Sequence, residues 1–198
     1  MVLNNMFKTE DVKAFFDSRA EGWDAQTVRK EDVIKKILDN VCVSQGDDVL
    51  DVACGTGVLF GDYLKRKVGS VTGIDISPAM AEIASNKYEN IQVICGNAQE
   101  YVFGKEFDVI VIYDAFPHFT DPSSLFESLS KHLKTGGRIT VAHSMSREAL
   151  TDLHKDRAGR VSFDLPEIGE LAEIMAEFFE ITFTISDECM YQVCAIKR

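Results

Sequence analysis

The sequence predicts an α/β fold, a three-layer, doubly wound and mainly parallel seven-stranded sheet that ends in a reversed last-strand hairpin and follows a helical N-terminal segment. Three observations predict it. Short apolar runs alternate with segments of helical spacing through the middle of the chain, and such alternation implies right-handed crossovers. A turn of small residues, 53–57, joins an apolar run directly to helical spacing. The last two apolar runs flank a short polar turn, which predicts an antiparallel pair.

The first 45 residues are predicted to form a helical N-terminal cap. Apolar residues between Val33 and Val41 recur at helical spacing and indicate a helix that packs on the sheet. Phe15, Phe16 and the single tryptophan, Trp23, precede it. The two phenylalanines are expected to dock the N-terminal helix. For Trp23, in its partly polar setting, docking and a role at a ligand site stay open as alternatives.

The middle of the chain, residues 46–143, is predicted to supply five strands and three helices. The strands are expected at 48–53, 70–75, 91–95, 107–113 and 137–143. The helices are expected near 57–67, 79–87 and 122–133. Two of these helices have recognisable starts, because Ser77-Pro78 and Asp121-Pro122 place a capping side chain before a proline of the first turn.

The C-terminal part contains an irregular segment followed by a helix and a hairpin. Residues 144–165 interrupt the alternation, and Ser146 is expected to cap a short helix from Arg147 to Lys155. This segment is either a surface connection or a lid over the substrate. In residues 166–198 a last long helix is predicted to begin near Pro166, followed by an antiparallel pair at 181–186 and 191–196.

The composition limits the classes of protein to which this chain can belong. The 198 residues, 45% of them hydrophobic, fit a single domain spanning 1–198. The net charge of −11 argues against a nucleic-acid partner, which a basic patch would attract. No apolar run approaches the ~20 residues of a membrane span. The five cysteines form no metal-binding pattern, and Cys54, Cys95 and Cys194 are expected to be buried free thiols. A cytoplasmic protein without a metal fits these features.

The turn at 53–57 predicts a nucleoside site. Gly55 and Gly57 lie where the predicted first strand meets the following helix, so a ligand can approach the backbone closely. Asp75 ends the next strand, a position from which a carboxylate accepts hydrogen bonds from ribose hydroxyls. The dinucleotide fingerprint needs a third glycine, but Phe60 stands in its place and Gly61 comes one residue too late.

Five ordered motifs give the chain a family resemblance. They are the acid-x-x-x-Gly-x-Gly of Asp51 to Gly57, the acid of Gly73-Ile-Asp75, Gly96-Asn97-Ala98, the strand and loop 107–119, and the Gly-Gly segment 133–141. This set, covering about residues 45 to 145, resembles the Rossmann-like (class I) S-adenosylmethionine-dependent methyltransferases of the small-molecule type. The resemblance implies S-adenosylmethionine as cofactor, S-adenosylhomocysteine as product, and 46–143 as the cofactor-binding core.

The resemblance also implies roles for individual residues. Asp75 takes the ribose, Gly55 and Gly57 let the backbone approach the amino-acid portion, and Asp51 acts through the turn or a bridging water. Asn97 replaces the usual aspartate, and its amide oxygen still accepts a hydrogen bond from the adenine amino group. The remaining residues expected at the cofactor are Ile76 and Met80 beside the adenine, with Ala98, Tyr113 and Trp23. The segment Ala20-Glu-Gly-Trp23-Asp24 is similar to one that folds over the cofactor in many members.

The acceptor is predicted to be a small, partly apolar molecule, to which the methyl group passes by in-line displacement. A general base is needed only where the acceptor is protonated in its ground state. The three candidates are His118 in the loop after the fourth strand, His143 at the end of the fifth, and His154 in the possible lid. For each of them an ordinary structural role is the alternative. Two other functions stay open: a non-catalytic S-adenosylmethionine-binding sensor or partner protein, and a nicotinamide-dependent oxidoreductase, which Phe60 opposes.

Overall fold

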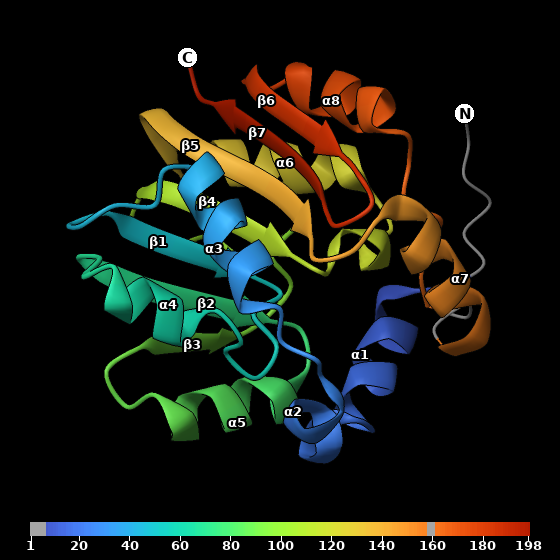
Figure 1. Cartoon of the computed structure of the whole chain (residues 1–198). Coiled ribbons are helices and arrows are strands. Elements are labelled where there is room, and N and C mark those ends of the chain that lie inside the picture. The colour runs from blue at the N-terminus through green and yellow to red at the C-terminus, as the bar shows by residue number, and fades with distance from the viewer. Residues whose placement is uncertain (1–6, 158–160) are drawn as a thin grey trace.

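The protein is built on one seven-stranded sheet with helices on both faces (Figure 1). A computed structural model describes the backbone of residues 7–157 and 161–198, and the side chains of all of these but 154–157. The strand order is β3-β2-β1-β4-β5-β7-β6. The strands are β1 (Asp48–Val52), β2 (Ser70–Asp75), β3 (Gln92–Cys95), β4 (Phe107–Tyr113), β5 (Leu133–His143), β6 (Glu180–Ser186) and β7 (Tyr191–Ile196). The first five are parallel, and β7 pairs antiparallel with β5 and β6, which confirms the predicted fold class.

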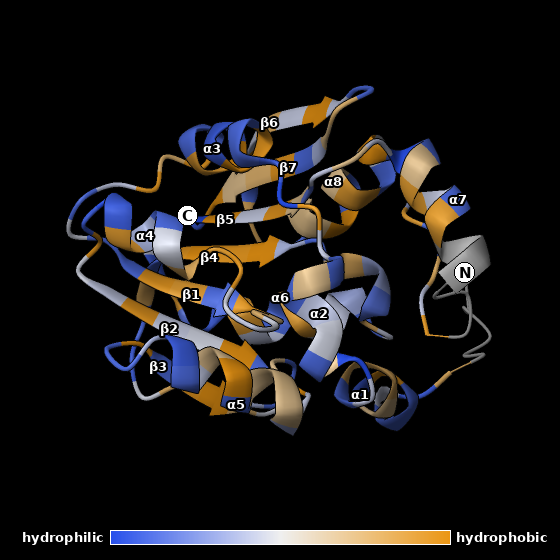
Figure 2. Cartoon of the chain, turned by 60° about the horizontal axis from the view of Figure 1, so that its bottom comes forward, coloured by the Kyte–Doolittle hydropathy of each residue, from blue (hydrophilic) through white to orange (hydrophobic). Residues whose placement is uncertain are grey.

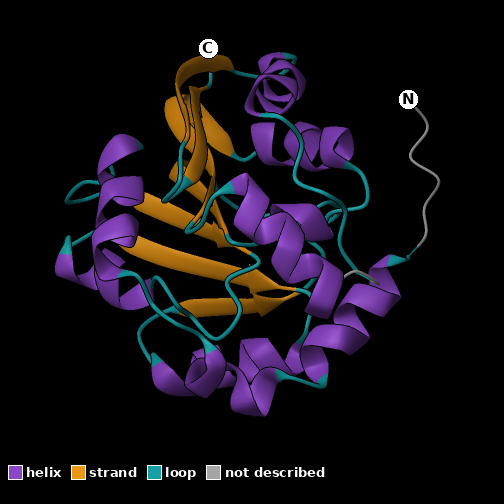
Figure 3. Ribbon diagram, turned by 45° about the vertical axis from the view of Figure 1, so that its right-hand side comes forward, coloured by secondary structure: helices purple, strands orange, loops and turns teal. Residues whose placement is uncertain are grey.

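Helices form the two outer layers, as Figure 3 shows. One face carries α3 (Glu31–Asn40), α4 (Phe60–Lys65) and α5 (Pro78–Lys87), whose buried residues join one core. The other face carries α6 (Pro122–Ser130) and α8 (Ile168–Ala176), which join a second core. The remaining helical elements are α1 (Thr9–Asp17), η1 (Ala20–Gly22), α2 (Trp23–Gln26), η2 (Phe116–His118) and α7 (Arg147–Arg157). Of these, α1 and α7 lie beyond the carboxyl ends of the parallel strands (Figure 1).

The alternation of side chains along the central strands separates the two cores. Leu50 of β1 and Ile110 of β4 belong to the core under α6 and α8, whereas Val49 and Val109 belong to the core under α3 and α4. All four are fully buried, because a parallel strand covered on both faces has no solvent side. In Figure 2 the central strands are largely hydrophobic, whereas the helices alternate between hydrophobic and hydrophilic residues.

Several element boundaries differ from those predicted. The helix predicted at 57–67 is limited to Phe60–Lys65, because Gly57 (φ +81°) still belongs to the turn and Lys67 (φ +56°) leaves the helical region. The helix predicted at 122–133 ends at Ser130, and β5 starts at Leu133 rather than at 137. A bulge at Gly136 (φ +75°) lies within this longer strand. The last long helix begins at Ile168, near Pro166 as predicted.

The cysteine prediction is wrong for one residue. Cys54 and Cys194 are buried, but Cys95 is exposed, because β3 is an edge strand with little covering it. Within the described residues, no helix is long and apolar enough to cross a membrane. Ser146 caps α7 as predicted, its Oγ accepting a hydrogen bond from the Ala149 backbone N–H at 3.1 Å.

Candidate functional site

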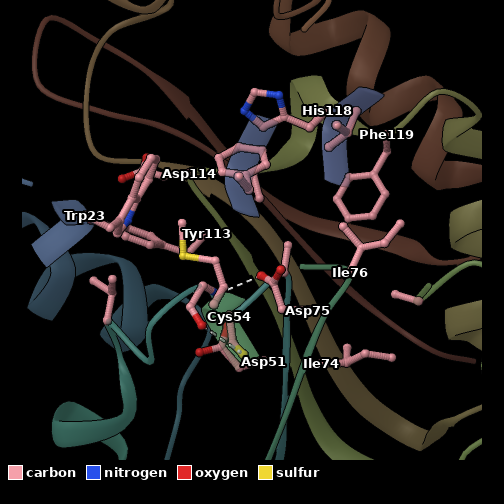
Figure 4. Close-up of a pocket in the computed structure, with 18 of the residues that line it drawn as sticks. Trp23, Asp51, Cys54, Ile74, Asp75, Ile76, Tyr113, Asp114, His118 and Phe119 are labelled. Atoms are coloured by element: carbon pink, nitrogen blue, oxygen red, sulfur yellow. Dashed lines mark hydrogen bonds between the residues drawn. The ribbon is translucent and has the colours of Figure 1, made fainter. Parts of the chain in front are cut away.

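The carboxyl ends of β1, β2 and β4 and the loop after β3 surround a cleft of about 160 Å³ (Figure 4). Ten of the residues predicted for the site line it: Trp23, Asp51, Gly55, Asp75, Ile76, Met80, Asn97, Ala98, Tyr113 and His118. Gly57 and His143 do not contribute to the lining. His154 belongs to α7, but its side chain lies outside the described residues. The topology explains the convergence, since parallel strands bring their carboxyl ends to one edge and β1 and β4 flank the switch in strand order.

The turn after β1 is held in a left-handed conformation. Ala53, Gly55 and Gly57 have φ of +56°, +55° and +81°, and the Gly55 N–H donates to Asp75 Oδ2 at 2.8 Å. A Cβ added at Gly55 would meet no atom within 4 Å, so this residue lines open space in the cleft. A Cβ at Gly57 would lie 2.7 Å from the ring of Phe60. Gly57 therefore shapes the turn around a core side chain.

The missing third glycine has a structural counterpart in β2. Phe60 is fully buried, and its Cζ would lie 2.6 Å from a Cβ added at Gly73. Cys54 Sγ would lie 2.8 Å from the same Cβ. The glycine that permits close packing of helix and strand is thus in the strand, and the helix supplies an aromatic ring. This arrangement differs from the dinucleotide fingerprint, in which the turn itself carries that glycine.

Two buried carboxylates lie side by side under the turn. Asp51 and Asp75 are only 2% and 7% exposed. Burial raises the pKa of Asp75 to about 6, against the opposing effect of the N–H groups of Ser77 and Gly55. Burial, followed by the charge of Asp75, raises the pKa of Asp51, which also faces the Tyr63 hydroxyl. Buried negative charge of this kind is costly unless a cation or hydrogen-bond donors compensate it, so a ligand with an ammonium and hydroxyl groups fits here.

The next part of the cleft forms an apolar slot with one amide. Met80 is buried at the first turn of α5, where Ser77 caps the helix and accepts from the Met80 N–H at 3.1 Å. Ile76 and Ala98 also line the slot. Asn97 Oδ1 accepts from the Gln99 N–H at 3.1 Å, a local turn that fixes the amide at the mouth of the slot. A flat heteroaromatic ring with an amino group fits such surroundings.

A polar cluster not predicted from the sequence lies at the ends of β4 and β5. Asp114 lines the cleft with φ +51°. Its Oδ1 accepts from the Ser144 N–H at 2.7 Å and its Oδ2 from the Ser144 hydroxyl at 2.8 Å. His143 lies behind it, with Nδ1 3.6 Å from Asp114 Oδ1 and only 1% exposure. The prediction that His143 reaches an acceptor is therefore not supported, since its ring is on the buried side of the strand end.

His118 is in the cleft, at the end of η2. Its Nδ1 lies 2.8 Å from the Val161 carbonyl oxygen, and its ring packs edge-on against Phe16 at 4.9 Å between centroids. Val161 and Phe163, from the segment predicted to be either a surface connection or a lid, cluster with Phe7 and Val12 near α1. His118 thus connects the loop after β4 to both the N-terminal segment and the segment after α7.

The N-terminal segment covers the cleft and is tied to the core by two aspartates. Asp17 Oδ1 accepts from the Ser77 hydroxyl at 2.5 Å and from the Ala79 N–H at 3.3 Å. Asp24 accepts from the Thr56 hydroxyl at 2.5 Å and from Lys87 Nζ at 2.6 Å. These contacts place Phe16 and Trp23 in the cleft wall. No role was predicted for either aspartate, although Asp24 directly follows Trp23 in the segment expected to fold over the cofactor.

Comparison with known proteins finds a family match and several relatives for this chain. The model of a methyltransferase-domain family matches residues 49–137. Demethylmenaquinone methyltransferase of Staphylococcus aureus (strain MRSA252) is 31% identical over 156 residues, which are 74% of this chain and 63% of that protein. Malonyl-(acyl-carrier protein) O-methyltransferase of Priestia megaterium is 22% identical over 187 residues, 85% of this chain and 68% of that protein. The chain thus spans less than two thirds of the Staphylococcus aureus enzyme.

Solved structures share the fold. The N-methyltransferase NodS of Bradyrhizobium japonicum WM9, in complex with S-adenosylhomocysteine, has a TM-score of 0.72 at 15% identity, covering 96% of this chain and 99% of that one. Magnesium protoporphyrin IX methyltransferase of Synechocystis PCC 6803 has a TM-score of 0.72 at 17% identity, with the same coverage.

The sheet, the glycine turn and these matches define a class I, Rossmann-like S-adenosylmethionine-dependent methyltransferase, as the five motifs predicted. The matched segment, 49–137, is the methyltransferase domain. The cleft beside it fits S-adenosylmethionine on three counts: buried carboxylates for an ammonium and a ribose, an apolar slot for adenine, and an open glycine turn between them.

Proposed function

We propose that this chain transfers the methyl group of S-adenosylmethionine to a small, partly apolar acceptor bound between the β4 loop and the N-terminal segment. The observation that supports this most directly is the division of the cleft. Residues suited to the cofactor follow β1, β2 and β3, whereas Phe16, Tyr113, His118 and Phe119 border the remaining space. The N-terminal segment is fastened across the opening, so the acceptor space suits a small molecule better than a folded macromolecule.

The cofactor, when bound, supplies a methyl group on a sulfonium that leaves as a neutral thioether. The chain holds it by proposed contacts of Asp75 with the ribose hydroxyls, Asp51 with the ammonium, and the Gly55 backbone with the amino-acid portion. The adenine would be held among Ile76, Met80 and Ala98. Asn97 would accept from its amino group, and Trp23 would cover the opening. Holding the acceptor and the methyl carbon in line is worth about 7–11 kcal/mol of the barrier. His118 is the proposed base where the acceptor must lose a proton.

The proposal is tested with the purified protein. Calorimetric titration measures affinity for S-adenosylhomocysteine and for NAD, and tritium-labelled S-adenosylmethionine reports transfer to a panel of phenols, amines and thiols. Tight binding of S-adenosylhomocysteine with labelled product is expected. Cofactor binding without any labelled product would favour the sensor, and binding of NAD in preference to S-adenosylhomocysteine would contradict the proposed activity.

The raised pKa of Asp75 predicts opposite effects of pH on binding and on stability. Ribose hydroxyls bind best to the carboxylate, so affinity for S-adenosylhomocysteine should rise with pH through about 6. The folded-state pKa is above the ordinary value of 3.8, so the folded protein binds the proton more tightly, and the contribution of Asp75 to stability falls as pH rises from about 4 to 6. Calorimetry between pH 5 and 7 checks the first effect. A flat affinity profile in wild type, or the same profile in Asp75→Asn, would contradict it.

A further inference from the structure

We propose that Asp114 binds an amine nitrogen of the acceptor, so that this chain is an N-methyltransferase for a small aromatic or apolar amine. The inference rests on the proposed function and names the substrate class of the same cleft. Asp51 and Asp75 are assigned to the cofactor, and Arg29 of the lining is engaged by Asp62 and Glu31. Asp114 is the remaining carboxylate of the cleft lining, and it lies on the acceptor side, at the end of β4.

The backbone of Asp114 is in the left-handed region. Its φ is +51°, a conformation that aspartate adopts more readily than most residues other than glycine. Both oxygens are fixed by Ser144, yet the side chain keeps 34% of its surface exposed. Each carboxylate oxygen has a second lone pair, so Asp114 is oriented and able to accept another hydrogen bond from a ligand.

Two further neighbours act on the Asp114 carboxylate, the Tyr113 side chain by hydrogen bonding and Lys30 by its charge. Lys30 Nζ donates to the Ser144 carbonyl at 2.8 Å, not to the carboxylate. His143 faces Asp114 Oδ1 from the buried side at 3.6 Å. Figure 4 shows Asp114 beside Trp23 and Tyr113 at the wall of the cleft, with His118 and Phe119 farther along. Aromatic rings with one carboxylate are surroundings that attract an ammonium, through cation–π contact as well as charge. A neutral alcohol gains less from them.

The chemistry balances with the groups present. An alkylammonium gives one N–H proton to the Asp114 carboxylate. The nitrogen lone pair then forms the N–CH₃ bond while the S–CH₃ bond breaks and its electron pair stays on sulfur. The product is again an ammonium, and the Asp114 carboxyl releases its proton to water. Asp114 therefore both selects the amine and accepts its proton.

The test compares two probes of nearly equal shape. Phenethylamine and 2-phenylethanol are titrated calorimetrically into the full chain saturated with S-adenosylhomocysteine, using wild type, Asp114→Asn and Glu173→Gln. Asparagine tolerates the left-handed backbone and can bond to Ser144, so the variant should keep its fold. Glu173 is exposed on α8 and provides the same change of charge away from the cleft.

Wild type and Glu173→Gln should bind the amine more tightly than the alcohol, by about ten-fold or more. In Asp114→Asn the affinity for the amine should fall by about ten- to hundred-fold. Affinity for S-adenosylhomocysteine should change less than about two-fold. Equal binding of the two probes, no amine binding, or an unaffected Asp114→Asn would overturn the inference. Failure to bind S-adenosylhomocysteine would instead refute the proposed function. Labelled methyl on alcohols but not on amines would leave that function intact and remove the amine assignment.

Discussion

Replacing Asp75 with alanine should raise the dissociation constant of S-adenosylhomocysteine by about 100-fold or more. Two hydrogen bonds from ribose hydroxyls to a charged acceptor are worth about 1.5–3 kcal/mol each, and 1.4 kcal/mol corresponds to ten-fold. The carboxylate also fixes the turn by accepting from Gly55 at 2.8 Å and from Ser77 at 2.9 Å. Loss of Asp75 therefore removes a ligand contact and loosens the adjacent backbone.

The same variant should lose little thermal stability. Two backbone N–H groups lose their partner, at a cost of about 1–3 kcal/mol each. Against this, the raised pKa of Asp75, about 6, means that its buried charge destabilises the folded state by roughly 3 kcal/mol at neutral pH. Alanine removes that charge and its cost. Calorimetry and thermal melts on one preparation separate the effects, with Glu82→Ala on the exposed face of α5 as control. Unchanged affinity would remove Asp75 from the cofactor site.

Replacing Gly73 with valine should lower the free energy of unfolding by about 3 kcal/mol or more. The first carbon alone would lie 2.6 Å from Phe60 Cζ and 2.8 Å from Cys54 Sγ. Both side chains are buried, so neither can move aside without displacing the core. A melting temperature lower by roughly 6–12 °C is expected for a chain of this size, measured by calorimetry or circular dichroism.

The matched control for this variant is Gly169→Ala. Gly169 is in α8, where an added Cβ meets no atom within 4 Å. Alanine is the better helix former by up to about 1 kcal/mol, so the melting temperature should stay level or rise. If the melting temperature of Gly73→Val equalled that of Gly169→Ala, close packing of Phe60 on β2 would not be a source of stability.

The parts of the molecule predicted well from sequence are those whose signal is local. The strand before the glycine turn, the turn and Asp75 all follow from neighbouring residues, and so do the proline-marked starts of α5 and α6. The end of α6 was missed because it depends on pairing of Leu133 with Phe107 across the sheet. Periodicity alone does not reveal that partner.

All the residues predicted for the cofactor except Gly57 line the cleft, and so does His118, whereas Asp114 of the same lining was not predicted. Asp114 was not predicted, because its orientation depends on Ser144, thirty residues away and directly after β5. His143 was assigned to the correct edge of the sheet, but at a strand end the sequence does not determine which face a side chain takes. Its pairing with Tyr191 of β7 and its 1% exposure settle that it is buried.

The two aspartate ties of the N-terminal segment have a kinetic consequence. Asp17 and Asp24 are bonded to Ser77 and Thr56, residues next to the acid and glycines assigned to the cofactor. We expect exchange of product for fresh cofactor to require that these ties break, so that the residence time of the product depends on how readily they open. Asp24 also forms a half-exposed ion pair with Lys87, which dissolved salt weakens. The rate of turnover is thereby linked to ionic strength at a contact some distance from the methyl group.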